Sequence, residues 1–213
     1  MTTNTLKTMY EEHHRSRQRD GFSVFEKERG EVLSQTIGSG KQVLDIGCRD
    51  GTLTQHFSKH NEVLGVDIDE RLLEKARRDL GIKTESFDLN GDWGELGGRR
   101  FDVVVAGEIL EHLYYPNKVI QRARAALKEN GMFIGSVPNA FSIKNRIRLF
   151  LGNKRNTPLA DPTHINHFSV SELSAMLRLH FSSVQIIGLG KYRKLARWLP
   201  GLFAFDLIFI ASL

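Results

Sequence analysis

Short apolar runs alternate along the chain with segments in which apolar residues recur every three or four positions. The runs predict β-strands, and the wider spacing predicts amphipathic helices between them. The seven expected strands are residues 42–46, 62–66, 83–87, 101–106, 132–137, 183–188 and 206–212. The expected helices are residues 22–37, 51–59, 70–80, 116–128, 141–154 and 171–180. Strands that alternate with helices in this way are typical of a doubly wound α/β sandwich.

The link between the last two strands differs from the others. It holds a basic helical turn at residues 191–199, followed by Pro200 and Gly201, in place of a crossover helix of the usual length. A short link favours antiparallel pairing of the strands that it joins. We therefore predict a seven-stranded, mostly parallel sheet with an antiparallel seventh strand, in a single domain of 213 residues.

The turn after the first strand is the first candidate binding site. It reads Gly47-Cys48-Arg49-Asp50-Gly51 and leads into a helix. The N-terminus of a helix exposes N–H groups with partial positive charge, and glycine lets a ligand approach the backbone. The turn therefore fits a ligand with an anionic group, although the same turn recurs in many other α/β proteins.

Two carboxylates at the ends of the next two strands extend the candidate binding site at this turn. Asp67 ends the second apolar run, and Asp88 ends the third predicted strand. In dinucleotide-binding folds, an acid at the end of the second strand accepts both hydroxyls of a ribose. Because these strand ends meet at one edge of the sheet, the set predicts a site for an adenosine-bearing cofactor. The alternative is that the acids only cap helices, since Asp is a favoured N-cap residue.

Five segments, in this order, carry a resemblance to a known family. They are VLDIGCRDGTLT at residues 43–54, GVDID at 65–69, FDLN at 87–90, FDVVVAGEILEHL at 101–113 and ALKENGMFIGSVPN at 126–139. Together they resemble the class I S-adenosylmethionine-dependent methyltransferases, in particular the small-molecule branch of types 11 and 23. That fold includes an antiparallel seventh strand. Arg49 stands where the family's G-x-G-x-G turn has its middle glycine.

The resemblance implies S-adenosylmethionine as cofactor, S-adenosylhomocysteine as product, and a role for each cofactor residue. The turn backbone would hold the methionyl part, Asp67 the ribose hydroxyls and Asp88 the exocyclic amine of adenine, because ionised carboxylates accept strong hydrogen bonds. Ile68 would pack on adenine, Asp45 would orient the turn, and Cys48 would be a packing residue rather than a nucleophile. The full expected set is Asp45, Gly47, Cys48, Arg49, Gly51, Asp67, Ile68, Asp88, Leu89, Gly107 and Glu108.

The segment after the fourth strand, AGEILEHL at residues 106–113, bears on the methyl acceptor. Relatives that methylate amino groups of nucleobases commonly show Asn or Asp followed by Pro-Pro and an aromatic residue here, and this chain does not. The only cysteine, Cys48, lies in the cofactor turn, which excludes the Pro-Cys nucleophile of cytosine-carbon enzymes. EILEHL is similar instead to the branch that methylates hydroxyls, carbons or carboxylates of small molecules.

Three histidines are candidates for the base that a hydroxyl acceptor requires. Methyl transfer from a sulfonium is an in-line displacement, so alignment supplies much of the rate, but a hydroxyl must also lose its proton. His164 and His167 lie in DPTHINHFS at residues 161–169, and a similar D-x-T-H-x-x-x-F-[ST] stretch recurs in this branch. We predict His164 as the catalytic histidine and His112 as the second candidate. The alternative is a histidine that braces the loop. No metal-ligand set is expected.

Residues 141–168 are predicted to be an insertion that forms a lid over the acceptor site, and residues 1–21 form a polar lead that helps to wall it. In residues 143–151 apolar and basic positions alternate. We favour a lid helix with an apolar inner face; the alternatives are a pocket wall, a phosphate contact or contact with a membrane surface. Residues 142–213 hold ten Lys or Arg against three Asp or Glu, so they either steer an anionic partner or form a solvated surface.

Composition narrows the cellular setting. A single cysteine excludes an intramolecular disulfide. The polar first 21 residues lack the apolar core of a signal peptide, and no apolar stretch is long enough for a transmembrane segment. We expect a soluble cytoplasmic enzyme whose partner is a small molecule, with anionic and lipid-like acceptors included, and not a nucleic acid. The alternatives are methyl transfer to nucleic acid or protein, and a protein that holds the cofactor without transferring methyl, which Arg49 supports.

Overall fold

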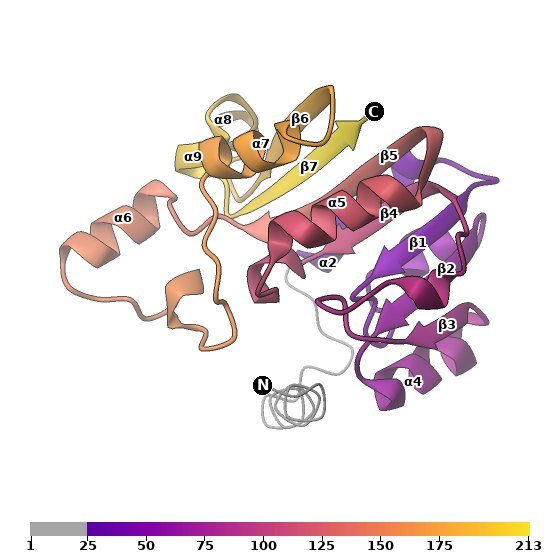
Figure 1. Ribbon diagram of the computed structural model, residues 1–213. Helices are drawn as coiled ribbons and strands as arrows, with labels where there is room; N and C mark the ends of the chain where they lie inside the picture. Colours follow the sequence, from indigo (N-terminus) through magenta and orange to yellow (C-terminus); the bar gives the residue numbers. More distant parts are fainter. Residues whose placement is uncertain (1–24) are drawn as a thin grey trace.

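The computed structural model describes residues 25–213, and its seven strands form one sheet with helices on both faces (Figure 1). The strands are β1 (Gln42–Ile46), β2 (Glu62–Asp67), β3 (Lys83–Ser86), β4 (Phe101–Gly107), β5 (Leu127–Pro138), β6 (Ser183–Leu189) and β7 (Asp206–Ser212). The order across the sheet is β3-β2-β1-β4-β5-β7-β6. β7 pairs antiparallel with both β5 and β6, whereas β1 to β5 are parallel. The predicted sheet, with its antiparallel seventh strand, is confirmed.

Helices cover both faces of the sheet. They are α2 (Glu26–Ile37), α3 (Gln55–Ser58), α4 (Glu70–Leu80), α5 (Pro116–Ala126), α6 (Ile143–Phe150), α7 (Val170–Arg178), α8 (Arg193–Trp198) and α9 (Pro200–Phe203). Of these, α6 packs against α9 and not against the sheet. Successive residues of a strand point to opposite faces, so Val103 packs in the cluster that contains α2, while Val104 packs in the cluster that contains α5 and α7. None of the helices between residues 25 and 213 has the length and apolar character needed to cross a membrane.

Local sequence signals set several helix ends. Asp69 caps α4 by accepting hydrogen bonds from the N–H groups of Arg71 and Leu72, and Gly81 ends it at φ 67°. Ser169 and Glu172 form a capping box at the start of α7. These caps fix the start of α4, which follows β2, and of α7, which follows the loop that carries His164. They therefore also fix where the adjoining site residues lie.

Two predicted boundaries are wrong. The helix after β1 covers only α3, because residues 51–54 form turns before it. β5 begins at Leu127, directly after α5, whereas we expected the helix to continue and the strand to begin at residue 132. A register shift between Phe101 and Val103 of β4 accommodates the longer strand. The predicted polar lead and residues 22–24 of the first helix lie outside the described residues.

Candidate functional site

A cavity of about 690 Å³ lies at the carboxyl ends of β1, β2 and β4. Most of its lining comes from five chain segments: the turn after β1, the end of β2, the residues after β3, the residues after β4 and the loop at 156–164. Of the predicted site residues, those that line it are Gly47, Cys48, Arg49, Asp67, Ile68, Asp88, Leu89, Gly107, Glu108, His112 and His164. Asp45 and Gly51 do not line it. The volume is in the range of pockets that enclose a cofactor-sized ligand.

The turn after β1 keeps a glycine-like backbone even where glycine is absent. Gly47 and Gly51 have φ of 74° and 80°, and Arg49 between them has φ of 51°. A side chain in this left-handed region costs on the order of 1 kcal/mol and persists only where its surroundings hold it. The N–H of Arg49 donates to Asp67 Oδ2 at 3.0 Å, which is such a restraint. Arg49 therefore preserves the shape of the turn and does not disrupt it.

Asp45 lies beneath this turn and not in the cavity. It is buried, and its Oδ2 accepts a hydrogen bond from Thr54 Oγ1 at 2.7 Å. This bond ties β1 to the residues that follow the turn. Burial raises the pKa of the Asp45 carboxyl from 3.8 to about 7, and the neighbouring charge of Asp67 adds to the effect.

The raised pKa makes folding stability depend on pH. Between about pH 4 and pH 7 the folded protein keeps a proton on Asp45 that the unfolded chain has released, so the contribution of Asp45 to the free energy of unfolding falls as pH rises through this window. Asp45→Asn removes this titration. In urea unfolding of the cofactor-free protein, we expect the fall to become shallower by up to about 1.4 kcal/mol per pH unit.

Asp102 offers a control for this measurement. Partial burial acts to raise the pKa of Asp102, but the Gln42 N–H and Lys128 together lower it below 3.8. Stability from Asp102 is therefore present above its unfolded pKa and is lost as pH falls below it. Asp102→Asn should leave the slope between about pH 4 and pH 7 unchanged. A slope that is the same in Asp45→Asn and in the wild type would contradict the assignment.

Backbone donors hold the two predicted cofactor carboxylates in place. Asp67 Oδ1 accepts from the N–H of Asp69 at 3.0 Å, in addition to the bond from Arg49. Asp88 Oδ1 accepts from Asn90 N at 2.9 Å and from Asn90 Nδ2 at 3.1 Å. Both carboxylates line the cavity from neighbouring strand ends. They therefore present fixed acceptor groups to a ligand that carries hydroxyl or amine donors.

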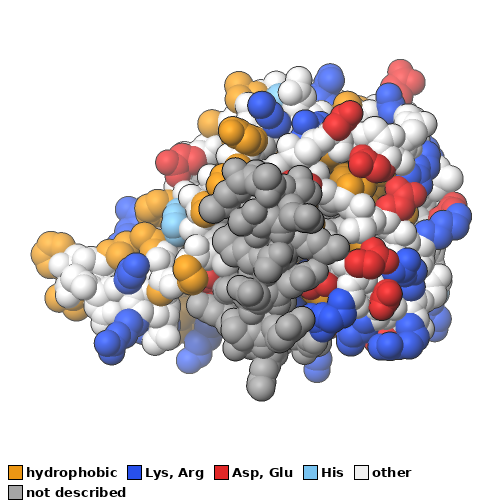
Figure 2. All heavy atoms as spheres, turned by 60° about the horizontal axis from the view of Figure 1, so that its bottom comes forward, with side chains coloured by type: hydrophobic (Ala, Val, Ile, Leu, Met, Phe, Trp, Pro, Cys, Tyr) orange, Lys and Arg blue, Asp and Glu red, His pale blue; other side chains and the backbone are white. Residues whose placement is uncertain are grey.

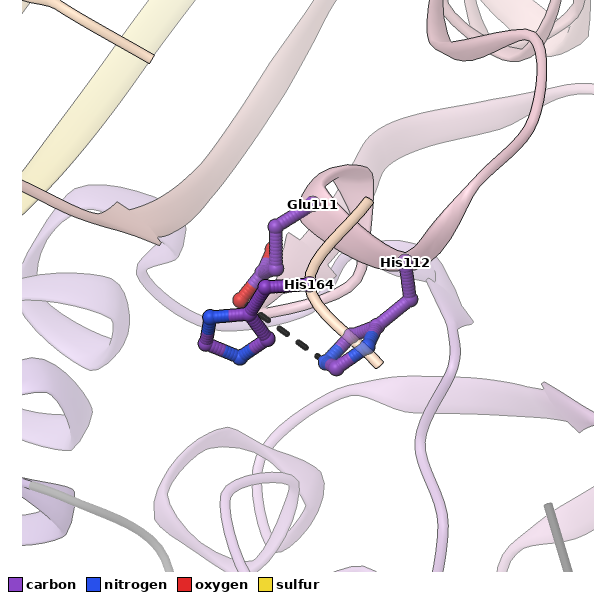
Figure 3. Close-up of side chains that lie close together, drawn as sticks. All are labelled: Glu111, His112 and His164. Carbon is purple, nitrogen blue, oxygen red and sulfur yellow. Dashed lines mark ion pairs between the residues drawn. The ribbon is translucent and has the colours of Figure 1, made fainter. Parts of the chain in front are cut away.

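Glu111, His112 and His164 come together at the same cavity. Glu111 and His112 belong to a short 3-10 helix, η2 (Leu110–His112), and His164 lies on the loop before α7. Figure 3 shows the three side chains converging, and the dashed line joins Glu111 and His112. One ligand atom from each residue lies within 4.8 Å of the others. The His112 and His164 rings meet edge to face, with centroids 4.8 Å apart.

Backbone hydrogen bonds fix the loop that carries His164 onto η2. The Glu111 carbonyl accepts from Ile165 N at 3.0 Å and from Asn166 N at 2.9 Å. His112 Nδ1 donates to the Thr163 carbonyl at 2.9 Å, which leaves Nε2 of the neutral ring as a hydrogen-bond acceptor or metal ligand. His167, the third candidate, does not line the cavity. The structure therefore brings His112 and His164 into one cluster and leaves His167 outside it.

Glu111 is a site residue that the sequence analysis did not identify. It is buried, and neither of its carboxyl oxygens accepts a hydrogen bond from the described residues; His112 Nε2 lies 4.0 Å from Oε1. Burial raises the pKa of Glu111 well above its usual range, and the nearby Glu108 adds to the shift. An uncompensated buried carboxyl next to two imidazoles is a proton-accepting group, and it is also a ligand set for a divalent cation. The E-x-x-E-H spacing after a central strand was the available signal.

Arg29 is the second functional candidate that the sequence analysis missed. It lies on α2, is 1% exposed, and also lines the cavity. Its Nη1 donates to Ser136 Oγ at 2.9 Å and lies 3.4 Å from Glu108 Oε1, while its Nε lies 3.6 Å from Asp206 Oδ2. Glu108 adopts φ of 57°, an unusual conformation for a non-glycine residue. Arg29 thus links α2 to the ends of β4, β5 and β7 at the floor of the cavity.

Comparisons with known proteins identify the family of the chain. A family model described as a methyltransferase domain matches residues 15–180. The ubiquinone biosynthesis O-methyltransferase of Coxiella burnetii is 30% identical over 114 residues, which are 51% of this chain and 48% of that protein. The mitochondrial ubiquinone biosynthesis O-methyltransferase of Candida albicans is 28% identical over 163 residues, covering 72% of this chain and 49% of that protein. The chain therefore spans about half the length of these curated relatives.

Solved structures share the fold. An S-adenosylmethionine-dependent methyltransferase from Archaeoglobus fulgidus superposes with a TM-score of 0.66 and 20% identity, over 89% of this chain and 93% of that chain. The magnesium protoporphyrin IX methyltransferase of Synechocystis, solved with bound S-adenosylhomocysteine, gives a TM-score of 0.65 and 17% identity, over 91% of this chain and 84% of that chain. At these identities the likeness concerns the fold alone.

Proposed function

The chain belongs to the methyltransferase-domain family, within the class I S-adenosylmethionine-dependent methyltransferases, and from that membership we propose that it transfers a methyl group to a hydroxyl oxygen of a small molecule. S-adenosylmethionine is the cofactor of this family, and it supplies an electrophilic methyl group on a sulfonium. The observation that carries the proposal is that the Glu111–His112–His164 cluster opens into the same cavity as Asp67 and Asp88.

The cofactor side of the cavity is assigned to residues that the resemblance also indicates. Asp67 accepts hydrogen bonds from the ribose hydroxyls, Asp88 accepts from the adenine amine, and the backbone of the turn at 47–51 holds the methionyl part. The contacts of Asp67 support this fit, because two backbone N–H groups orient its carboxylate before a ligand binds.

The acceptor side is assigned to η2 and the loop at 156–164, with the insertion at 141–168 as one wall. His164 takes the proton of the hydroxyl as its oxygen attacks the methyl carbon in line. His112 has a positioning role, because its Nδ1 holds the Thr163 carbonyl next to His164. Glu111 stabilises the positive charge that develops on the imidazole. The predicted N-terminal wall lies outside the described residues.

The same cluster supports a second way to activate the hydroxyl. Two imidazoles and one carboxylate form a ligand set for a divalent cation, and a bound cation lowers the pKa of a coordinated hydroxyl. Dialysis against EDTA separates the two routes. If His164 acts as the base, turnover survives metal removal. If a cation is required, turnover is lost and returns with one added metal, and mass spectrometry finds that metal bound to the wild type but not to His164→Ala.

Small-molecule acceptors are favoured over macromolecules by two observations. The curated relatives are named for O-methylation in ubiquinone biosynthesis, and the segment at 106–113 lacks the motif of nucleobase amino-methylating enzymes. The test is a transfer assay with methyl-labelled S-adenosylmethionine against phenols, catechols, hydroxy acids, RNA and protein. Label in a small-molecule ether supports the proposal. Label only in RNA or protein contradicts it, and cofactor binding without transfer to any acceptor indicates a binding protein.

The role of Asp88 has a specific test. Asp88→Ala removes the acceptor for the adenine amine, and we expect S-adenosylmethionine to bind about tenfold more weakly, since a bond to a charged group is worth about 1.5–3 kcal/mol. Asp88→Asn keeps one acceptor oxygen and should weaken binding less. Calorimetry with an inosine analogue provides the check on the ligand, because wild-type protein that binds it as tightly as the adenosine form would rule out this contact.

A further inference from the structure

We propose that the surface formed by residues 141–155 and 191–205, here called the α6–α9 face, binds an anionic lipid bilayer. This inference goes beyond methyl transfer and does not depend on it, because it rests on the exposure, spacing and charge of side chains outside the cofactor site. The face lies at one end of the molecule, where α6 projects beside α8 and α9 (Figure 1).

The apolar stripe of α6 faces outward. Ile143, Ile147, Phe150 and Leu151 recur at helical spacing, and they are 41%, 53%, 90% and 71% exposed. The residue that α6 buries is Asn145, whose Nδ2 donates to the carbonyl of Asn139 at 3.0 Å. The prediction of a lid helix with an apolar inner face is therefore wrong. The inner contact is a polar anchor, and the apolar side is free for a partner.

The segment at 191–205 continues the same kind of surface. Trp198 is 80% exposed and Tyr192 is 61% exposed, while the one residue that α8 buries is Ala196. α6 packs against α9, so the exposed side chains of both segments lie at one end of the fold. In Figure 2, hydrophobic side chains stand beside Lys and Arg at this projecting end. An apolar area that is rimmed by basic groups marks an interaction site rather than scattered exposure.

The positive charge of the α6–α9 face indicates which kind of partner it binds. Residues 141–155 and 191–205 contain nine Lys or Arg and no Asp or Glu. Basic side chains next to exposed aromatic and aliphatic groups match the two layers of a bilayer surface, since the former contact anionic headgroups and the latter enter the boundary with the acyl chains. Nucleic acid would use the charges and stack on the aromatic rings, but it would leave Ile147 and Leu151 without a suitable contact.

The face adjoins the cavity. Lys144 and Phe205 belong to the two segments and also line the cavity. A bilayer bound to the α6–α9 face would therefore lie beside the cavity mouth. Delivery of a lipid-soluble acceptor from the bilayer is a consequence that rests on the proposed function, whereas the lipid contact itself does not.

The test is co-sedimentation of the full chain with vesicles of phosphatidylcholine, with and without phosphatidylglycerol as the anionic lipid. We expect binding to the mixed vesicles that weakens with salt. Phe150→Ser with Leu151→Ser should lower the affinity at least about tenfold by removing apolar surface from the boundary. Lys154→Glu with Lys194→Glu should lower it at least about tenfold by reversing two charges.

Matched controls lie elsewhere on the described surface. Leu179 is 70% exposed on the last turn of α7, and Lys27 and Lys59 are exposed on α2 and after α3. The single variant Leu179→Ser and the double variant Lys27→Glu with Lys59→Glu should each bind vesicles with an affinity within about twofold of the wild type. Circular dichroism and S-adenosylmethionine affinity confirm that each variant is folded without requiring turnover.

Three results would overturn the proposal. The first is wild-type protein that does not bind anionic vesicles, and the second is an equal loss of binding in the controls. The third is preferred binding of an RNA or DNA duplex that the lysine variants abolish and the Phe150 and Leu151 variants leave intact. If sedimentation velocity instead shows that the apolar variants dissociate an oligomer, the face is an interface between copies of this chain.

Discussion

Replacing Asp67 by alanine is expected to weaken S-adenosylmethionine binding by at least about tenfold, measured by isothermal titration calorimetry. Asp67 ends β2 at the cavity, and backbone N–H groups of Arg49 and Asp69 fix its carboxylate. The proposed ribose contact uses two hydroxyl donors, and each hydrogen bond to a charged acceptor contributes about 1.5–3 kcal/mol. Asp67→Asn keeps an acceptor without the charge and should fall between the wild type and the alanine variant.

The control for this variant is Asp69→Ala. Asp69 lies two residues away and caps α4, but it does not line the cavity. Its loss should cost about 0.5–2 kcal/mol of folding stability without removing a cofactor contact. If Asp69→Ala lowers the affinity as much as Asp67→Ala, the effect arises from a disturbed turn and not from a ribose contact. An Asp67→Ala protein with wild-type affinity would remove Asp67 from the site.

His164→Ala is expected to lower turnover about a hundred- to ten-thousandfold and to leave S-adenosylmethionine affinity nearly unchanged. The reason is that His164 lies in the cavity-lining cluster with Glu111 and His112, which is the proposed acceptor side, and has no proposed contact with the cofactor. Turnover should be measured at saturating S-adenosylmethionine with the best acceptor found in the transfer assay, so that kcat and KM for the acceptor are separated.

His167→Ala is the matched control, because His167 lies on the same loop but does not line the cavity. It should retain most of the wild-type kcat. Equal losses in the two variants would indicate that the loop needs its histidines for structure. A His164→Ala enzyme with normal turnover would exclude His164 as base and leave alignment of the acceptor to supply the rate.

The fold was predictable because its signals are local. Most strands are short apolar runs, with β3 (Lys83–Ser86) as the exception. The signals at helix ends, such as Gly81 after α4 and the Ser169 capping box before α7, lie next to the helix that they end or begin. The start of β5 was missed because residues 128–131, Lys-Glu-Asn-Gly, carry no apolar side chain. Leu127 pairs with Phe101 and Met132 pairs with Val103 of β4, and these two pairings, not local apolar spacing, carry the strand across them. Tertiary contacts decide such boundaries.

The cofactor side of the cavity followed from the sequence for a topological reason. Residues at the carboxyl ends of adjacent parallel strands must meet, so Asp67 and Asp88 line one cavity. This topological argument could not predict the contact between Arg29 and Asp206. The two residues are 177 positions apart, and only the insertion of β7 beside β5 brings them together. The same argument could not predict which side of α6 faces the rest of the protein. The buried amide of Asn145, and not the apolar stripe, makes the inward contact.

The order of strands at one edge of the sheet has a consequence for which part of the molecule unfolds locally. β6 precedes β7 in the chain, yet among the described strands its ladder partner is β7. β6 therefore cannot be held in place until β7 has inserted next to β5, which requires closure of a long loop. We therefore expect β6, β7 and the two helices between them, α8 and α9, to unfold together as one cooperative unit. This local unfolding should occur before the parallel strands unfold. Because Asp206 begins β7 and the preceding Phe205 lines the cavity, such an opening would unseal the cavity while β1, β2 and the carboxylates of Asp67 and Asp88 keep their places.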